Sequence, residues 1–182
     1  MKYSIAGTLA VLALASTAAF ADNMAAPAVP AESAQLDFFL GNWNCNGKAF
    51  ASATGPEHAS VATVHAAKAI GGRWQHVTYD ETKTAANPAP YHVGVYWGYD
   101  AGKKNFVQFC ADGFGGYCNQ TSAGWSGDTL IFEGTGNGDG KQFGARDTFT
   151  RKAANEFVHS GEMQGDDKKW VKTDEETCKR AK

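Results

Sequence analysis

The chain has 182 residues, of which 43% are hydrophobic and 20% are charged, as expected for one ordinary globular domain with a buried core. This composition excludes a disordered or fibrous chain. The 17 basic residues are scattered and stand against 19 acidic ones, so the formal net charge is only −2. The sequence therefore lacks the basic surface that binds nucleic acid or anionic lipid, and no such partner is expected.

The N-terminus has the three parts of a secretory signal peptide. Lys2 gives a positive start, residues 5–14 are apolar, and Ala19-Phe20-Ala21 forms a small-residue cleavage site. We therefore expect residues 1–21 to be removed and the mature protein to be periplasmic or secreted. The apolar run is too short to span a bilayer, and no later segment is apolar enough, so no membrane span is expected.

The segment after the cleavage site, residues 22–35, is rich in alanine and proline and is predicted to be a flexible leader. The folded domain is expected to comprise residues 36–182. Within it, short segments with β-branched or aromatic residues alternate with turn sequences, as in all-β barrels and sandwiches. The ten predicted strands are residues 42–52, 59–70, 73–81, 91–99, 105–112, 117–125, 129–134, 143–151, 156–164 and 169–179.

Glycine- and aspartate-rich turns between these segments are short, which favours antiparallel neighbours. One of them is the run of residues 136–140. Ten consecutive antiparallel strands leave two exposed edges unless the sheet closes, and an up-and-down barrel removes both. The predicted fold is therefore all-β, a single antiparallel up-and-down barrel of about ten strands. The weakest strand prediction is 59–70, because its alanines also suit a helix.

The four cysteines form an even set in a chain with export features, which predicts two disulfides among three possible pairings. Cys110 and Cys118 flank a glycine-rich turn and would staple that hairpin. Cys45 and Cys178 would meet only if the first and last strands are neighbours, so their pairing tests closure of the barrel. The sequence has no C-x-x-C motif, and no zinc site is predicted at these cysteines.

The sequence around the first predicted strand resembles the opening of calycin-type barrels, with an apolar turn followed by G-x-W at Gly41-Asn42-Trp43. The later order of Gly71-Gly72-Arg73-Trp74, Gly98-Tyr99-Asp100, Lys103-Lys104 and a final strand ending near Thr177-Cys178-Lys179-Arg180 resembles the DUF1579 family of bacterial lipocalin-like proteins. The resemblance covers essentially residues 36–180. It implies a lipocalin-like β-barrel, and the family carries no established activity.

The same opening also resembles nitrobindin-type haem barrels, whose motif is G-x-W-x-G-x-G. Gly41, Trp43 and Gly47 match, whereas Cys45 replaces the middle glycine. Those barrels hold iron through a histidine on a late strand, so the resemblance implies His159 as the haem ligand. No other cofactor is expected.

Aromatic and imidazole side chains on the strands are the candidate lining of an interior site. A barrel of this size either accommodates one small apolar ligand or is filled by its own side chains. Trp43 is expected to plug one end, with its indole N–H bonded to a polar partner. The candidate lining residues are Trp43, Trp74, His76, Tyr96, Phe109, Phe132, Phe149, Phe157 and His159.

Ionisable residues give no motif for a catalytic or metal site. The five histidines are scattered without H-x-H or H-E-x-x-H spacing, so each is expected to be a surface or hydrogen-bonded histidine. Asp147 and Glu162 are the carboxylates that could face inward as a pair. No G-x-S-x-G, Walker A or dinucleotide fingerprint occurs.

The sequence thus predicts a non-enzymatic, exported barrel that binds a small apolar or amphiphilic molecule. Two alternatives remain open. One is a nitrobindin-like haem protein that acts on reactive nitrogen species through His159, and the other is a filled barrel that serves as an interaction module. The identity of the ligand and the oligomeric state stay undetermined at this point.

Overall fold

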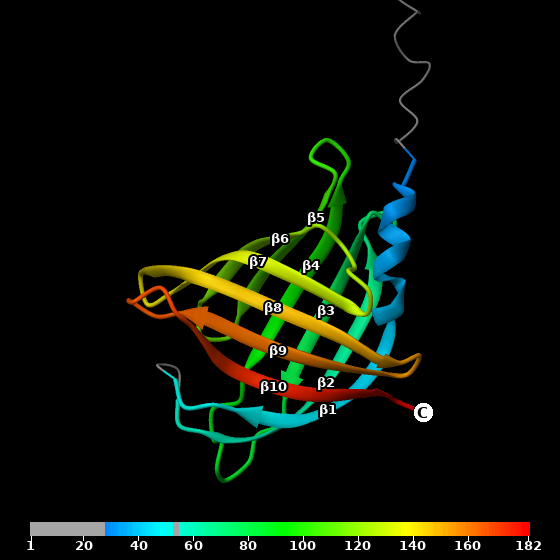
Figure 1. Ribbon diagram of the computed structural model, residues 1–182. Helices are drawn as coiled ribbons and strands as arrows, with labels where there is room; N and C mark the ends of the chain where they lie inside the picture. The colour runs from blue at the N-terminus through cyan, green and yellow to red at the C-terminus, as the bar shows by residue number, and fades with distance from the viewer. Residues whose placement is uncertain (1–27, 53–54) are drawn as a thin grey trace, which may run out of the picture.

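The computed structural model describes residues 28–52 and 55–182. A 3-10 helix, η1 (Ala31–Phe39), precedes ten strands that form one closed antiparallel barrel (Figure 1). The strands are β1 (Gly41–Ala49), β2 (His58–Ala69), β3 (Trp74–Glu81), β4 (His92–Asp100), β5 (Asn105–Asp112), β6 (Tyr117–Ser122), β7 (Thr129–Gly138), β8 (Lys141–Ala153), β9 (Glu156–Gln164) and β10 (Trp170–Arg180). The predicted signal peptide lies outside the described residues.

Each strand pairs with its neighbours in the chain, and β1 also pairs with β10, which closes the barrel. The register places Cys45 opposite Cys178, and a disulfide joins them. A second disulfide joins Cys110 and Cys118 across the β5–β6 hairpin. The predicted barrel and its test by disulfide pairing are both confirmed.

All ten predicted strands are present, and segment 59–70 belongs to strand β2. The main difference lies at the β7–β8 hairpin, where the predicted turn of residues 136–140 contracts to Asp139 and Gly140. Both have positive φ, as a two-residue type I′ turn requires. The preceding glycines continue the β7 ladder instead. Strand β6 ends at Ser122, three residues before its predicted end.

Helix η1 is the element that the sequence analysis missed, because residues 31–35 were assigned to the flexible leader. Its buried residues are Ser33, Leu36 and Phe39, spaced by three. A 3-10 helix has three residues per turn, so these side chains form one stripe along the helix. The alanine- and proline-rich composition of residues 22–35 instead suggested a flexible leader.

The stripe on η1 covers the end of the barrel at which β1 begins, where η1 is drawn in blue (Figure 1). The Phe39 ring lies 4.9 Å from that of Trp97 and 5.3 Å from that of Phe157. Trp43 is 1% exposed, and its Nε1–H donates to the Phe39 carbonyl at 2.7 Å, which confirms its predicted role as a plug. This part of the interior is filled by aromatic side chains.

Among the residues that the structure describes, no helix is long and apolar enough to cross a membrane.

Candidate functional site

The inward-facing side chains change character along the barrel axis. On three adjacent strands, the inward residue nearer η1 is apolar and the inward residue two positions farther away is ionisable. The apolar residues are Phe149, Phe157 and Cys178, and the ionisable ones are Asp147, His159 and Glu176. We call the η1 end the apolar half of the interior and the other end the polar half.

His159 lies at the centre of the polar half, with a carboxylate at each ring nitrogen. Its Nε2–H donates to Asp147 Oδ1 at 3.0 Å. On the other side of the ring, Nδ1 lies 3.1 Å from Asp174 Oδ2 and 3.5 Å from Glu176 Oε2. We call these four residues the His159 cluster.

The strand register assembles this cluster from three strands. Glu176 of β10 lies opposite His159 of β9, while Asp174 and Asp147 both lie opposite Gly161, from β10 and β8 respectively. A Cβ atom at position 161 would collide with the Asp174 carboxylate. Glycine at this position therefore leaves the space that the Asp174 side chain occupies.

Neutral side chains fix the orientation of the carboxylates. Gln108 Nε2 donates to Asp147 Oδ2 at 2.8 Å, and Gln108 Oε1 accepts from Trp97 Nε1–H at 2.5 Å. On the opposite wall, Glu176 Oε1 accepts from Ser60 Oγ at 2.8 Å and from Tyr79 OH at 2.7 Å. Hydrogen bonds therefore hold the cluster in place and connect it, through Gln108, to Trp97 in the packed apolar core.

The electrostatics of the cluster favour a positively charged His159. Burial by itself would lower the pKa of His159, but the charge of Asp174 and the contacts with Asp147 and Glu176 raise it well above its usual value. Burial likewise opposes ionisation of Asp174, yet the charge of His159 lowers the pKa of Asp174. Burial, followed by the charge of Glu176, raises the pKa of Tyr79, which therefore stays neutral and donates its proton.

Solvent reaches the cluster despite its interior position. The side chains of His159, Asp147 and Asp174 are 19%, 26% and 27% exposed, whereas that of Glu176 is 3% exposed. The aromatic residues of the apolar half are nearly inaccessible, with Phe39 at 2%. The polar half is thus the accessible part of the interior.

Aromatic and polar side chains also gather around Tyr91, which precedes β4. The Tyr91 ring stacks with Phe114 at a centroid distance of 6.1 Å, and Phe114 is 56% exposed. Tyr91 OH donates to Asp112 at 3.2 Å, and its backbone N–H donates to Glu81 at 2.9 Å. Burial and then the charge of Asp112 raise the pKa of Tyr91.

The nine predicted lining residues divide between the two faces of the barrel wall. Five of them face the interior: Trp43, Phe132, Phe149, Phe157 and His159. The other four face outward, so their placement in the lining was wrong: Trp74, His76, Tyr96 and Phe109. Whether the inward residues bind a ligand is a separate question.

The error at these four positions has a geometric cause, because side chains on one strand alternate between the two faces. Gln75 and Val77 face inward on β3, which places the residues on either side of Gln75 outside. The Trp74 ring then lies on the outer face over Gly98, where an added Cβ would be 2.7 Å from it. Glu162 also faces outward, where it pairs with Arg146 at 3.4 Å, whereas Asp147 faces inward as considered.

Asp174 and Glu176 are the site residues that the sequence analysis missed. The available signal was the alternation of Asp174, Glu176 and Cys178 on β10. Once Cys178 is placed inside opposite Cys45, both acidic residues follow on the same face. The spacing of histidines could not reveal the cluster, because its members come from different strands.

Comparison with known proteins agrees with this architecture. The family model described as "Protein of unknown function (DUF1579)" matches residues 30–180, which include η1 and all ten strands. The chain belongs to the DUF1579 family. A search of curated proteins gives no match.

Two solved structures are similar to this DUF1579 protein to different degrees. Rv2717c from M. tuberculosis is 14% identical, with a TM-score of 0.66, and the match covers 85% of this chain and 100% of that one. This likeness shows a shared fold. A protein of unknown function from the DUF3598 family of Nostoc punctiforme PCC 73102 is 9% identical over 84% of this chain and 100% of that one, and its TM-score of 0.24 is too low to carry an argument.

The interior of the DUF1579 barrel does not fit the haem that the resemblance to nitrobindin-type barrels implies. A haem iron needs open space in front of a ring nitrogen for its macrocycle, but carboxylate oxygens lie 3.0–3.5 Å from both ring nitrogens of His159. The Phe149 ring lies 4.8 Å from that of His159. An apolar macrocycle beside the ring would also bury Asp147, Asp174 and Glu176 against hydrocarbon, at a high cost in free energy.

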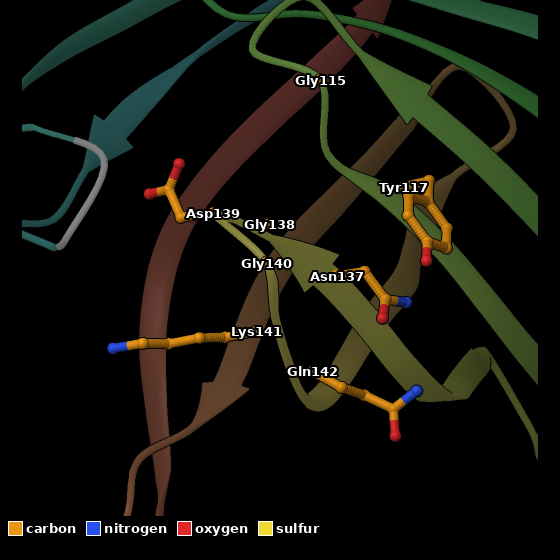
Figure 2. Close-up of a pocket in the computed structure, with 8 residues that line it drawn as sticks. All are labelled: Gly115, Tyr117, Asn137, Gly138, Asp139, Gly140, Lys141 and Gln142. Carbon is orange, nitrogen blue, oxygen red and sulfur yellow. The ribbon is translucent and has the colours of Figure 1, made fainter.

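A surface hollow of about 220 Å3 lies outside this cluster, at the β5–β6 and β7–β8 turns of the DUF1579 barrel (Figure 2). It is lined by Gly115, Tyr117 and residues 137–142. The two charged side chains, Asp139 and Lys141, extend away from those of Asn137 and Gln142, so charged groups do not converge on it (Figure 2). The His159 cluster is therefore the stronger candidate site.

Proposed function

We propose that this DUF1579 protein is an exported, non-enzymatic barrel that binds a small amphiphilic molecule in the polar half of its interior. One observation carries this proposal. The inward ionisable residues Asp147, His159 and Asp174 remain 19% to 27% exposed, while the aromatic residues behind them are packed to near-complete burial.

The cluster is costly to maintain for stability alone. Placing three carboxylates and one imidazole inside a barrel requires their partial desolvation, which often costs more free energy than the ion pairs return. Apolar side chains at the same positions would extend the aromatic core. Such retained interior charges are more common at binding and catalytic sites than elsewhere.

The surroundings of the cluster favour an amphiphilic molecule over a fully apolar one. The polar group of the ligand would contact Asp147, His159 and Asp174. Its apolar part would lie against Val93, which shares the inward face of β4 with buried Trp97 but lies four residues farther from η1, and against Tyr91, which bonds to Asp112 opposite Val93. Ligand pockets generally combine an apolar lining with a few fixed polar groups.

Export is part of the proposal. The Cys45–Cys178 and Cys110–Cys118 disulfides suit an oxidising compartment such as the periplasm. The predicted signal peptide at residues 1–21 points to the same location.

A neutral amphiphilic probe, N-phenyl-1-naphthylamine, tests the interior binding directly by its fluorescence increase. We expect saturable binding to the wild-type protein and its loss in Val93→Trp, because an indole at this inward position fills the polar half. Val61→Trp is the matched control, since Val61 is 44% exposed on the outer face of β2. Absence of binding, or equal binding by both variants, would instead favour a filled barrel that acts as an interaction module.

A further inference from the structure

The His159 cluster brings together the ligand types that hold divalent metal ions in proteins, namely imidazole and carboxylate. His159, Asp174 and Glu176 each present one ligand atom, and the three atoms lie within 4.8 Å of one another. The separations from Nδ1 are 3.1 Å to Asp174 Oδ2 and 3.5 Å to Glu176 Oε2. Ligand atoms that share an ion at about 2.0–2.2 Å stand roughly 3–3.6 Å apart, so these two separations match a shared ion.

One oxygen that points into this triangle forms an ion pair but makes no hydrogen bond. Asp174 Oδ2 is buried and has no hydrogen-bond partner, although it faces His159 Nδ1. The other oxygen of the same carboxylate, Oδ1, accepts from Thr173 Oγ1 at 2.9 Å. A buried carboxylate oxygen that makes no hydrogen bond keeps its lone pairs available, and a cation bound beside Nδ1 would accept one of them.

The outer partners of the three residues also match those of metal ligands. A metal-binding histidine usually donates its second ring N–H to a carboxylate, and His159 Nε2–H donates to Asp147 Oδ1. Ser60 and Tyr79 both donate to Glu176 Oε1, which leaves Oε2 for an ion. These contacts orient the ligand atoms before any ion arrives.

Charge and access agree with a divalent ion. Two ligating carboxylates balance two positive charges, and the side chains of His159 and Asp174 are 19% and 27% exposed, so an ion can enter from solvent. A set of one imidazole and two carboxylates suits Zn²⁺, Mn²⁺ and neighbouring first-row ions. Three protein ligands leave coordination positions for water or for a bound molecule.

We propose that His159 Nδ1, Asp174 and Glu176 bind one divalent transition-metal ion, with Asp147 as the residue that positions the His159 ring. The ion would take the place of the proton on Nδ1. This inference goes beyond the amphiphile binding proposed above and does not depend on it.

Isothermal titration of the chelator-treated wild-type protein with ZnCl₂ or MnCl₂ alone tests the site. We expect one equivalent of at least one ion to bind, and saturable binding to be lost in Glu176→Gln and Asp174→Asn. Glu175→Gln is the matched control, because it removes the same charge from the adjacent position, which pairs with Lys172 on the outer face. Asp147→Asn is expected to weaken binding by about 10- to 100-fold, as for other outer partners of ligands.

A second measurement needs no substitution in the site. In the wild-type protein, Mn²⁺ is expected to broaden the NMR signals of the His159 ring before those of His65, whose Nδ1 contacts Asn42 on the exposed face. Near-ultraviolet circular dichroism checks that each variant used in the titration is folded. If a variant is not folded, the NMR experiment on the wild-type protein still tests the metal site.

The proposal is overturned if neither ion binds stoichiometrically, if the two ligand variants bind as the control does, or if the His159 signals are unaffected. N-phenyl-1-naphthylamine binding is measured separately on the chelated protein. If the probe does not bind but a metal ion does, the proposed function is contradicted and the metal site is supported. If the probe binds but no metal ion does, the metal site is contradicted and the proposed function is supported.

Discussion

The two halves of the barrel interior are built on the same strands yet organised by different interactions. In the apolar half, the Phe157 ring packs against those of Phe39 and Trp43, and these side chains exclude solvent. In the polar half, His159 and its carboxylates depend on hydrogen bonds and ion pairs and stay partly exposed. The packed aromatic residues and the ionisable residues are thus separated along the barrel axis.

This separation follows from the energetics of burial. Each aromatic side chain that is fully buried in the apolar half contributes about 1.5–3 kcal/mol to folding. The ion pairs of the polar half return little net stability because their desolvation is costly. The apolar half can therefore support a site that contributes little to stability.

The disulfides give the largest expected difference between the halves. The Cys45–Cys178 disulfide is buried with the aromatic core and spans 133 residues of sequence, whereas Cys110–Cys118 spans 8. On the chain-entropy relation, replacing the first pair by alanine lowers the free energy of unfolding by about 5 kcal/mol, and replacing the second by about 2–3 kcal/mol. Urea unfolding of the two double variants measures both. Equal losses would contradict this ranking.

A pair of phenylalanine substitutions compares the halves more locally. Phe157→Ala removes a ring that is 3% exposed and that contacts Phe39, Trp43 and Phe149, and we expect a loss of about 3–5 kcal/mol. Phe114→Ala removes a ring that is 56% exposed, and we expect a change of about 0.5 kcal/mol or less. Chemical denaturation of both variants tests the contrast, and a similar loss for both would remove it.

The third comparison is a pH-dependent effect in the polar half. Because the pKa of His159 is raised in the folded state, its stabilising charge is fully present below the unfolded-state value of about 6.5 and is lost as the pH rises through the folded-state value. His159→Gln should therefore cost about 1–3 kcal/mol near pH 6 and less at alkaline pH. Unfolding in the presence of chelator measures this difference.

His65→Gln serves as the control for that series, since the His65 ring bonds to the exposed side chain of Asn42 at 2.7 Å, away from the His159 cluster. We expect this variant to have a small effect across the same pH range. A cost of His159→Gln that does not change with pH would show that the charge of the ring has no part in the cluster.

Most of the fold follows from local sequence patterns. Val93, Val95 and Trp97 alternate with other residues along one strand face, as is typical of a β-strand, and all three lie in β4. Closure was predicted from the number of strands, and the Cys45–Cys178 disulfide meets the test that the sequence analysis set for it. Helix η1 escaped prediction because its three-residue period is short and its first half is rich in alanine.

The candidate site was predictable only in part, because it depends on the register between strands. His159 was singled out from the sequence, but Asp174 approaches it only through the β9–β10 pairing, which includes a register shift between Lys172 and Asp174. Aromatic identity alone was a poor guide, as Tyr96 and Phe109 show by their outward position. A better guide to which face a residue occupies was an even spacing along the strand from a residue known to face inward, such as Cys178.

The proposal that the polar half of the interior is a binding site can be tested by native mass spectrometry of the protein isolated from its own host. We expect an additional non-covalent mass on the wild-type protein, either an amphiphile or a metal ion, that is absent after denaturation. If the mass is an organic ligand, it should be missing from Val93→Trp. If it is a metal ion, it should be missing from Glu176→Gln. A bare wild-type mass after extraction without detergent or chelator would contradict the proposal.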